Sequence, residues 1–84
     1  MSTTPPTWHT QLLQIVSDLS AVEPERIGLE DRLREDLGFD SVSAMELISM
    51  LAEELEIEVE LEEAMSVHDV QGVFALAERH LHDR

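Results

Sequence analysis

Apolar residues recur every three or four positions in three separate stretches of this 84-residue chain, and this helical period is the strongest constraint on its fold. The stretches predict helices at 7–20, 41–55 and 70–81. The run EIEVELEE (56–63) alternates as a strand would, but no second strand-like run exists to pair with it. We therefore interpret it as an extended linker that enters a short third helix at 62–65. The pattern predicts an all-α four-helix bundle with three main helices, one short third helix and a long loop between the first two.

The long loop, 21–39, is unusual for a compact domain and is therefore a candidate functional segment. Isolated apolar residues recur along this loop, and we expect their side chains to anchor it to the core: Val22, Ile27, Leu29, Leu33 and Leu37. In the second helix the period assigns a core-facing stripe to Leu47, Ile48, Leu51 and Leu55. A second, partly apolar face is left exposed, formed by Val42, Met45, Ser49 and Ala52 and flanked by Glu46 and Glu53.

Helix boundaries are marked by residues with known end preferences. Asp40 and Asp69 are the expected N-caps of the second and last helices, because a carboxylate can accept hydrogen bonds from free amides. The last helix presents one face to the core, formed by Val70, Val73, Phe74, Ala77 and Leu81, and Trp8 is a core residue of the first. Residues 1–6, with two prolines, and 82–84 are expected to fray. One domain is expected to span 1–84.

The charge and length limit the function. With 19 acidic residues against five basic ones, the net charge is −14, which argues against nucleic-acid and membrane partners and favours basic protein surfaces. A chain this short buries only about 60% of its unfolded surface, which leaves little room for an enzyme's catalytic pocket. The absence of cysteine, signal peptide and membrane span predicts a cytoplasmic protein. No obvious self-associating face is present, so we expect a monomer. We expect no metal site: His80, His82 and the glutamate pairs 53–54 and 62–63 should be solvated.

Ser41 follows an acidic, glycine-containing turn and precedes the second helix. A serine there is often only a helix cap. A helix start also offers partial positive charge and free amides to an anion, so a phosphodiester on Ser41 would be well placed. Both interpretations remain open on these residues alone.

The stretch DRLREDLGFDSVSAMELISMLAEELEIEVELEEA (31–64) resembles the acyl carrier proteins. Their Asp-Ser-Leu signature is met here as Asp40-Ser41-Val42, after Glu35-Asp36-Leu37-Gly38. The similarity extends from about Trp8 to Leu81.

This resemblance implies a carrier role without a catalytic site of its own. A phosphopantetheinyl transferase would move the 4'-phosphopantetheine arm from coenzyme A onto Ser41, making the chain a phosphoprotein, and the arm's terminal thiol would carry acyl groups as thioesters. The thiol that the sequence lacks would thus arrive on the prosthetic group.

The resemblance also implies a docking surface for enzymes with basic patches, such as the transferase, an acyltransferase or a ketosynthase. The residues of this sequence at the corresponding docking positions are Asp40, Val42, Met45, Glu46, Ser49 and Glu53. An acyl chain could be sheltered by Leu51, Val59, Ala64 and Val67, for which plain core packing is the alternative.

Departures from the family pattern bear on the pathway. Val42 replaces the usual leucine, Ser43 stands where an acid is common, Ala52 interrupts the acidic run, and Phe39 precedes the signature where fatty-acid carriers have alanine. We therefore expect a carrier of polyketide or hybrid biosynthesis, with type II fatty acid synthesis as the alternative. The alternative of another class is an acidic helical protein-interaction module without a prosthetic group, in which Ser41 is only a cap.

Overall fold

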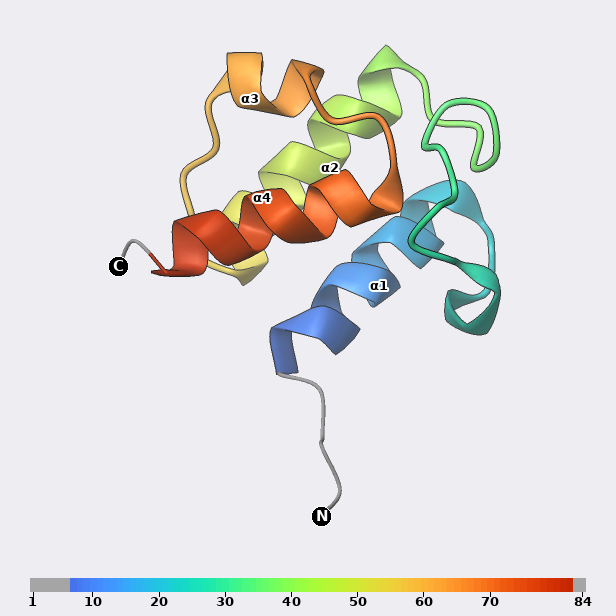
Figure 1. Ribbon diagram of the computed structural model, residues 1–84, viewed down its shortest axis with the longest axis horizontal. Helices are drawn as coiled ribbons and strands as arrows, with labels where there is room; N and C mark the ends of the chain where they lie inside the picture. The colour runs from blue at the N-terminus through green and yellow to red at the C-terminus, as the bar shows by residue number, and fades with distance from the viewer. Residues whose placement is uncertain (1–6, 83–84) are drawn as a thin grey trace.

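The computed structural model describes residues 7–82, which form four α-helices and one 3-10 helix. Their bounds are α1 Thr7–Ser20, η1 Pro24–Arg26, α2 Ser41–Glu54, α3 Leu61–Met65 and α4 Val70–His82. No strand forms within this range, so the predicted all-α bundle is confirmed (Figure 1). Each expected α-helix is present with its ends displaced by at most one residue, whereas η1 was not foreseen. The fraying expected at 1–6 and 83–84 lies outside the described residues, and His82 continues α4.

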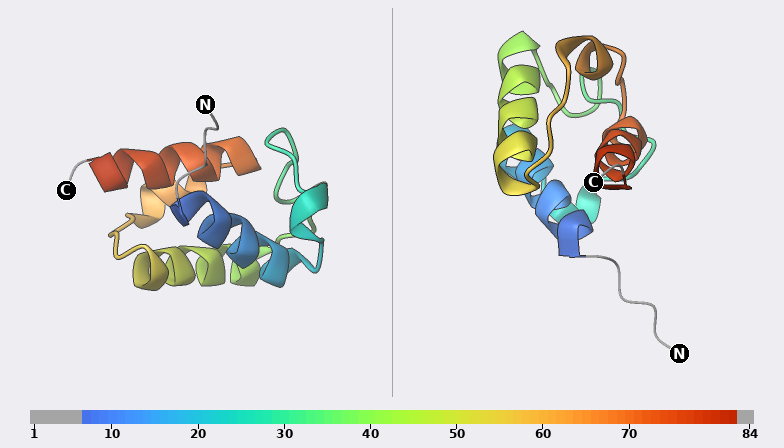
Figure 2. Two further views of the ribbon diagram at one scale, coloured as in Figure 1. Left: turned by 90° about the horizontal axis from the view of Figure 1, so that it is seen from below. Right: turned by 90° about the vertical axis from the view of Figure 1, so that its left-hand side faces the viewer.

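The helices form a small bundle in which α2 and α4 lie on opposite sides and α1 crosses between them (Figure 2). The short α3 covers the side opposite α1. The long loop wraps one end of the bundle, where α1 ends and where α2 and α4 begin (Figure 1). No helix within 7–82 is long and apolar enough to cross a membrane.

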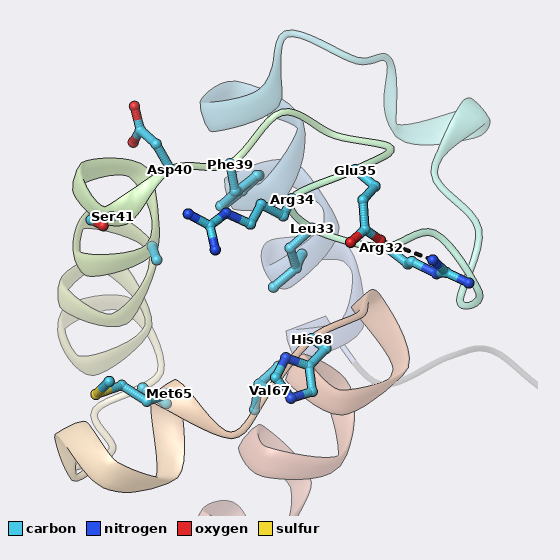
Figure 3. Close-up of a pocket in the computed structure, with 12 residues that line it drawn as sticks. Arg32, Leu33, Arg34, Glu35, Phe39, Asp40, Ser41, Met65, Val67 and His68 are labelled. Carbon is cyan, nitrogen blue, oxygen red and sulfur yellow. Dashed lines mark hydrogen bonds and ion pairs between the residues drawn. The ribbon is translucent and has the colours of Figure 1, made fainter.

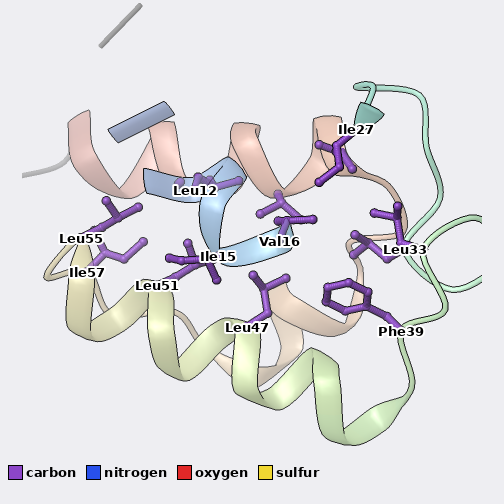
Figure 4. Close-up of a cluster of buried hydrophobic side chains, with 14 residues drawn as sticks. Leu12, Ile15, Val16, Ile27, Leu33, Phe39, Leu47, Leu51, Leu55 and Ile57 are labelled. Carbon is purple, nitrogen blue, oxygen red and sulfur yellow. The ribbon is translucent and has the colours of Figure 1, made fainter. Parts of the chain in front are cut away.

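The core lies between these helices and is built from aliphatic rows at the predicted period (Figure 4). Its largest fully buried side chains are Leu12, Ile15, Val16, Leu51, Val70 and Val73. The prediction for Ile48 was wrong, because it is only half-buried. The buried row of α2 is Leu47, Leu51 and Leu55, and this row is flanked on its other side by Met50, which leaves Ile48 at the edge. In α4, Leu76 is buried, although the sequence did not mark it.

Aromatic side chains close the edge of the core between α1 and α4. Trp8 and Phe74 are half-buried against the core rather than inside it, and their ring centroids are 5.9 Å apart. Trp8 therefore lies at the edge of the core, whereas the sequence predicts it within the core.

The loop anchors mostly behave as predicted. Ile27, Leu33 and Leu37 are buried in the core and Val22 packs against it. Leu29 is an exception, with 53% of its surface exposed. Its backbone makes the attachment instead, because the Leu29 carbonyl accepts a hydrogen bond from the Gln71 amide at 3.0 Å.

Backbone hydrogen bonds tie this loop to the start of α4. The Leu33 amide donates to the His68 carbonyl at 3.0 Å, and the Val70 amide donates to the Asp31 carbonyl at 3.0 Å. The expected cap of α4 is confirmed, since the Asp69 carboxylate accepts from the Gly72 amide at 2.8 Å. The loop is thus held against the start of α4.

The short α3 is attached to α4 through Glu63. The Glu63 carboxylate accepts from the Glu60 amide at 3.4 Å, pairs with the Arg79 guanidinium and lies 3.1 Å from His80 Nε2. Burial alone would raise the pKa of Glu63, but these hydrogen bonds outweigh it and lower the pKa. The expectation that Glu63 and His80 are solvated was wrong, because the approach of α3 to α4 brings them together.

Candidate functional site

A tight turn delivers the chain from the loop to the start of α2. The amides of Asp36 and Leu37 donate to the Arg32 carbonyl at 3.0 and 3.1 Å, and Gly38 then adopts a left-handed backbone conformation with φ +71°. The next residue, Phe39, donates its amide to the Leu33 carbonyl at 2.8 Å and buries its ring, which is only 5% exposed. Phe39 therefore anchors the chain directly before the Asp40-Ser41 pair.

Asp40 is the N-cap of α2, as predicted. Its Oδ1 accepts a hydrogen bond from the Ser43 amide at 2.8 Å, and its carbonyl accepts from the Ala44 amide at 2.9 Å. The bond from the Ser43 backbone, aided by the Ser43 side chain, holds the pKa of Asp40 below its ordinary value. A negative charge is thereby maintained beside Ser41.

Ser41 is exposed at the first position of α2, and its hydroxyl makes no hydrogen bond to any residue in the range 7–82. The capping role belongs to Asp40, so the interpretation of Ser41 as a mere cap is wrong. The Ser41 hydroxyl is therefore exposed to solvent at the start of α2.

A cleft of about 550 Å³ runs beside Ser41, between the long loop, the first turn of α2 and the connection from α3 to α4 (Figure 3). This volume lies within the range of ordinary small-molecule sites. The lining residues come from all three segments: Arg32, Leu33, Arg34, Glu35, Phe39, Asp40, Ser41, Ala44, Ala64, Met65, Val67 and His68. The hydrogen bond from the Leu33 amide to the His68 carbonyl joins the wall formed by the loop to the wall formed by the connection from α3 to α4.

Only half of the predicted acyl-sheltering set lines this cleft. Ala64 and Val67 do, whereas Leu51 is 1% exposed in the core and Val59 packs against that core. For Leu51 and Val59 core packing is therefore the correct interpretation. Arg34 and His68 were not predicted as lining residues, because their proximity depends on the contact between two segments far apart in the chain.

The predicted docking residues lie on the outer face of α2. Val42 and Met45 are 66% and 60% exposed, which is high for apolar side chains of this size. With Glu46, Ser49 and Met50 they line a shallow depression of about 460 Å³. Asp40 and Glu53 are exposed towards the two ends of the same helix. Four of the six predicted docking residues therefore line this depression together with Met50. The other two, Asp40 and Glu53, lie outside it.

Comparison with known proteins identifies the family. A family model described as a phosphopantetheine attachment site matches residues 10–76. The chain belongs to the acyl carrier protein family. Phosphopantetheine is the prosthetic group of this family, and the match includes the loop, the start of α2 and both far walls of the cleft.

Individual relatives of this carrier support the assignment. It is 42% identical over 59 residues to an acyl carrier protein of Thermosynechococcus vestitus, covering 70% of this chain and 73% of the relative. It is 37% identical over 59 residues to an acyl carrier protein of Campylobacter concisus, covering 67% and 77%. It also matches the non-reducing polyketide synthase sorB of Penicillium rubens at 37% identity over 65 residues, which are 77% of this chain and 2% of the synthase.

The residues present fit a covalent phosphopantetheine group. Ser41 offers an exposed hydroxyl without an internal partner, and the adjacent cleft provides both apolar and cationic walls. No group of carboxylate and imidazole side chains within residues 7–82 is arranged to hold a metal ion.

Proposed function

We propose that Ser41 carries 4'-phosphopantetheine and that this protein presents acyl groups, held as thioesters on the terminal thiol of that arm, to partner enzymes. The observation that supports the proposal is that Asp40 and Ser41 have different roles at the start of α2. Asp40 satisfies the helix end, which leaves the Ser41 hydroxyl exposed and unbonded beside the cleft.

The attachment needs chemistry that a transferase supplies. The Ser41 Oγ forms a bond to the phosphorus next to the pantetheine, and the bond from that phosphorus to the bridging oxygen of coenzyme A's diphosphate breaks. Adenosine bisphosphate leaves, and the hydroxyl proton passes to a base of the transferase. This chain contributes an accessible nucleophile on a rigid helix and no catalytic group.

The outer face of α2 is the surface by which this carrier meets its enzymes. Val42 and Met45 supply exposed apolar area, while Asp40, Glu46 and Glu53 supply negative charge around them. Complementary charge raises the rate of encounter with a basic partner more than it raises affinity. A transferase, an acyltransferase and a ketosynthase with basic docking patches fit this surface.

We place the carrier in polyketide or hybrid biosynthesis, with type II fatty acid synthesis as the alternative. The match to a stretch of a polyketide synthase supports this choice. The buried ring of Phe39, which stands where fatty-acid carriers have alanine, supports it as well.

The decisive experiment for Ser41 is intact-protein mass spectrometry after incubation with coenzyme A and a broad-specificity phosphopantetheinyl transferase. We expect the mass of one phosphopantetheinyl group on the wild type, located on Ser41 by peptide mapping. Ser41→Ala should gain nothing, whereas Ser43→Ala, the nearest other serine, should still be loaded. No gain on a folded wild-type sample would overturn the proposal and favour an interaction module without a prosthetic group.

The docking surface is tested by the rate of the same loading reaction. Met45→Glu and Glu46→Lys should slow loading several-fold while leaving the melting temperature nearly unchanged, because neither side chain lies in the core. Glu78→Lys, an equal charge change at an exposed site on α4, is the matched control. Equal rates in all three variants would show that the docking surface lies elsewhere.

A further inference from the structure

The cleft beside Ser41 holds an arginine without a partner. Arg32 pairs with Glu35 at 3.1 Å and Arg79 pairs with Glu63, but Arg34 makes no hydrogen bond or ion pair within residues 7–82. Arg34 is exposed, in a chain with 19 acidic residues and only five basic ones. In Figure 3 the Arg34 guanidinium extends from the loop towards the first turn of α2, where Ser41 lies.

The carboxylates that line the same cleft do not neutralise Arg34. Glu35 is engaged by Arg32, and this hydrogen bond raises the pKa of Arg32. Asp40 is engaged by the Ser43 amide, and its carboxylate points away from the Arg34 guanidinium (Figure 3). The positive charge of Arg34 therefore remains available to a ligand.

His68 supplies a second donor from another wall of the cleft. Its backbone is fixed by the hydrogen bond from the Leu33 amide, while its imidazole has no hydrogen-bond partner within residues 7–82. A histidine ring carries at least one N–H in either protonation state, and a guanidinium offers paired N–H donors that match phosphate and carboxylate oxygens.

We propose that Arg34 and His68 form an anion-binding site in this cleft, and that its ligand is an anionic group carried on the prosthetic arm. This inference rests on the proposed modification of Ser41. The nearer source of the anion is the phosphodiester that joins the arm to Ser41, and the other is a carboxylate at the end of the acyl group.

Such a site would change how the arm is held. Modification adds a negative charge next to Asp40 in a chain that already carries −14, which by itself disfavours the compact state. Arg34 offsets this repulsion by holding the anion against the cleft. Arg34 and His68 act here as positioning residues, since neither takes part in acyl transfer.

The test is a thermodynamic cycle in which loading of the arm is one change and Arg34→Gln is the other. Melting temperatures are measured for the apo, loaded, acetyl-loaded and malonyl-loaded forms of the wild type, Arg34→Gln and His68→Gln, with each state verified by intact mass. Arg26→Gln is the matched control, because Arg26 lies on η1, outside the cleft, and also has no ion pair within residues 7–82. The Arg34 Nε–H resonance, followed by NMR before and after loading, reports the contact directly.

For a phosphodiester ligand, loading should lower the melting temperature of Arg34→Gln relative to wild type by an additional ~2–4 °C, as expected for an exposed ion pair in a domain of this size. His68→Gln should shift in the same direction by less, and Arg26→Gln should match the wild type. The Arg34 resonance should move on loading.

A dependence on Arg34 that appears only with the malonyl form would identify the acyl carboxylate as the ligand. No dependence in any loaded form, with a stationary Arg34 resonance, would overturn the anion site while leaving the carrier role intact. Failure of the wild type to gain mass would instead overturn the proposed function itself.

Discussion

Gly38 offers the sharpest test of how the turn before Ser41 is built. Its φ of +71° lies in the left-handed region, and a Cβ added there would meet no atom within 4 Å. A Gly38→Ala substitution would therefore cost backbone strain without a steric clash. For a residue with a Cβ that strain is about 1–2 kcal/mol. In a domain of this size it corresponds to a fall in melting temperature of about 4–16 °C.

The assay is urea unfolding of the unmodified protein, followed by circular dichroism, with the slope of the transition compared between variants. Gly38→Asn should recover part of the loss, because asparagine enters the left-handed region more readily than alanine. Gly28→Ala is the control: Gly28 does not have a positive φ, and its added Cβ would lie 3.8 Å from Asp31 Oδ2, an ordinary contact. That change should be neutral or stabilise the fold by about 0.4–1 kcal/mol.

The reasoning is refuted if Gly38→Ala lowers the free energy of unfolding no more than Gly28→Ala does. The turn would then be able to reach Phe39 and Asp40 by another backbone path. A change in slope would point to an altered unfolded state rather than to strain in the turn.

Three further predictions concern the core, the charge and the attachment of α3. Leu51→Ala, at a fully buried site, should lower the free energy of unfolding by about 3–5 kcal/mol, whereas Met45→Ala should change it by less than about 0.5 kcal/mol. Similar losses for the two variants in urea unfolding would contradict the assignment of the buried and exposed faces of α2. Added salt should raise the melting temperature at neutral pH, because it screens the net charge of −14. A melting temperature that does not change with salt in calorimetry would exclude charge repulsion as a main source of instability in the fold. Because hydrogen bonds lower the pKa of Glu63 despite its burial, its contribution to stability is present above the unfolded-state pKa of about 4.3 and is lost as the pH falls through the lower folded-state value. Glu63→Gln should therefore be less stable than wild type at neutral pH and approach it below about pH 4, and a constant difference across an acid titration would contradict this.

Much of the site was accessible from local sequence patterns. The cap at Asp40 and the outward face of Val42 and Met45 follow from the residue type at a helix start and from the 3.6-residue period. Both depend on interactions among residues close in the chain, so they could be predicted without knowing how the helices pack. The spacing of the Asp-Ser signature after Gly38 likewise directed attention to Ser41.

The sequence by itself thus determined the four helices, the Asp40 cap of the second helix and the acidic, partly apolar face beside Ser41. Only the tertiary structure decided that the Ser41 hydroxyl is exposed and unbonded beside a cleft. It also left Ile48 at the edge of the core, exposed Leu29, and brought Arg34 and His68 to one cleft. The physical reason is that these outcomes depend on long-range contacts, such as the hydrogen bond from the Leu33 amide to the His68 carbonyl, and the periodicity of either segment says nothing about which distant segment it will meet.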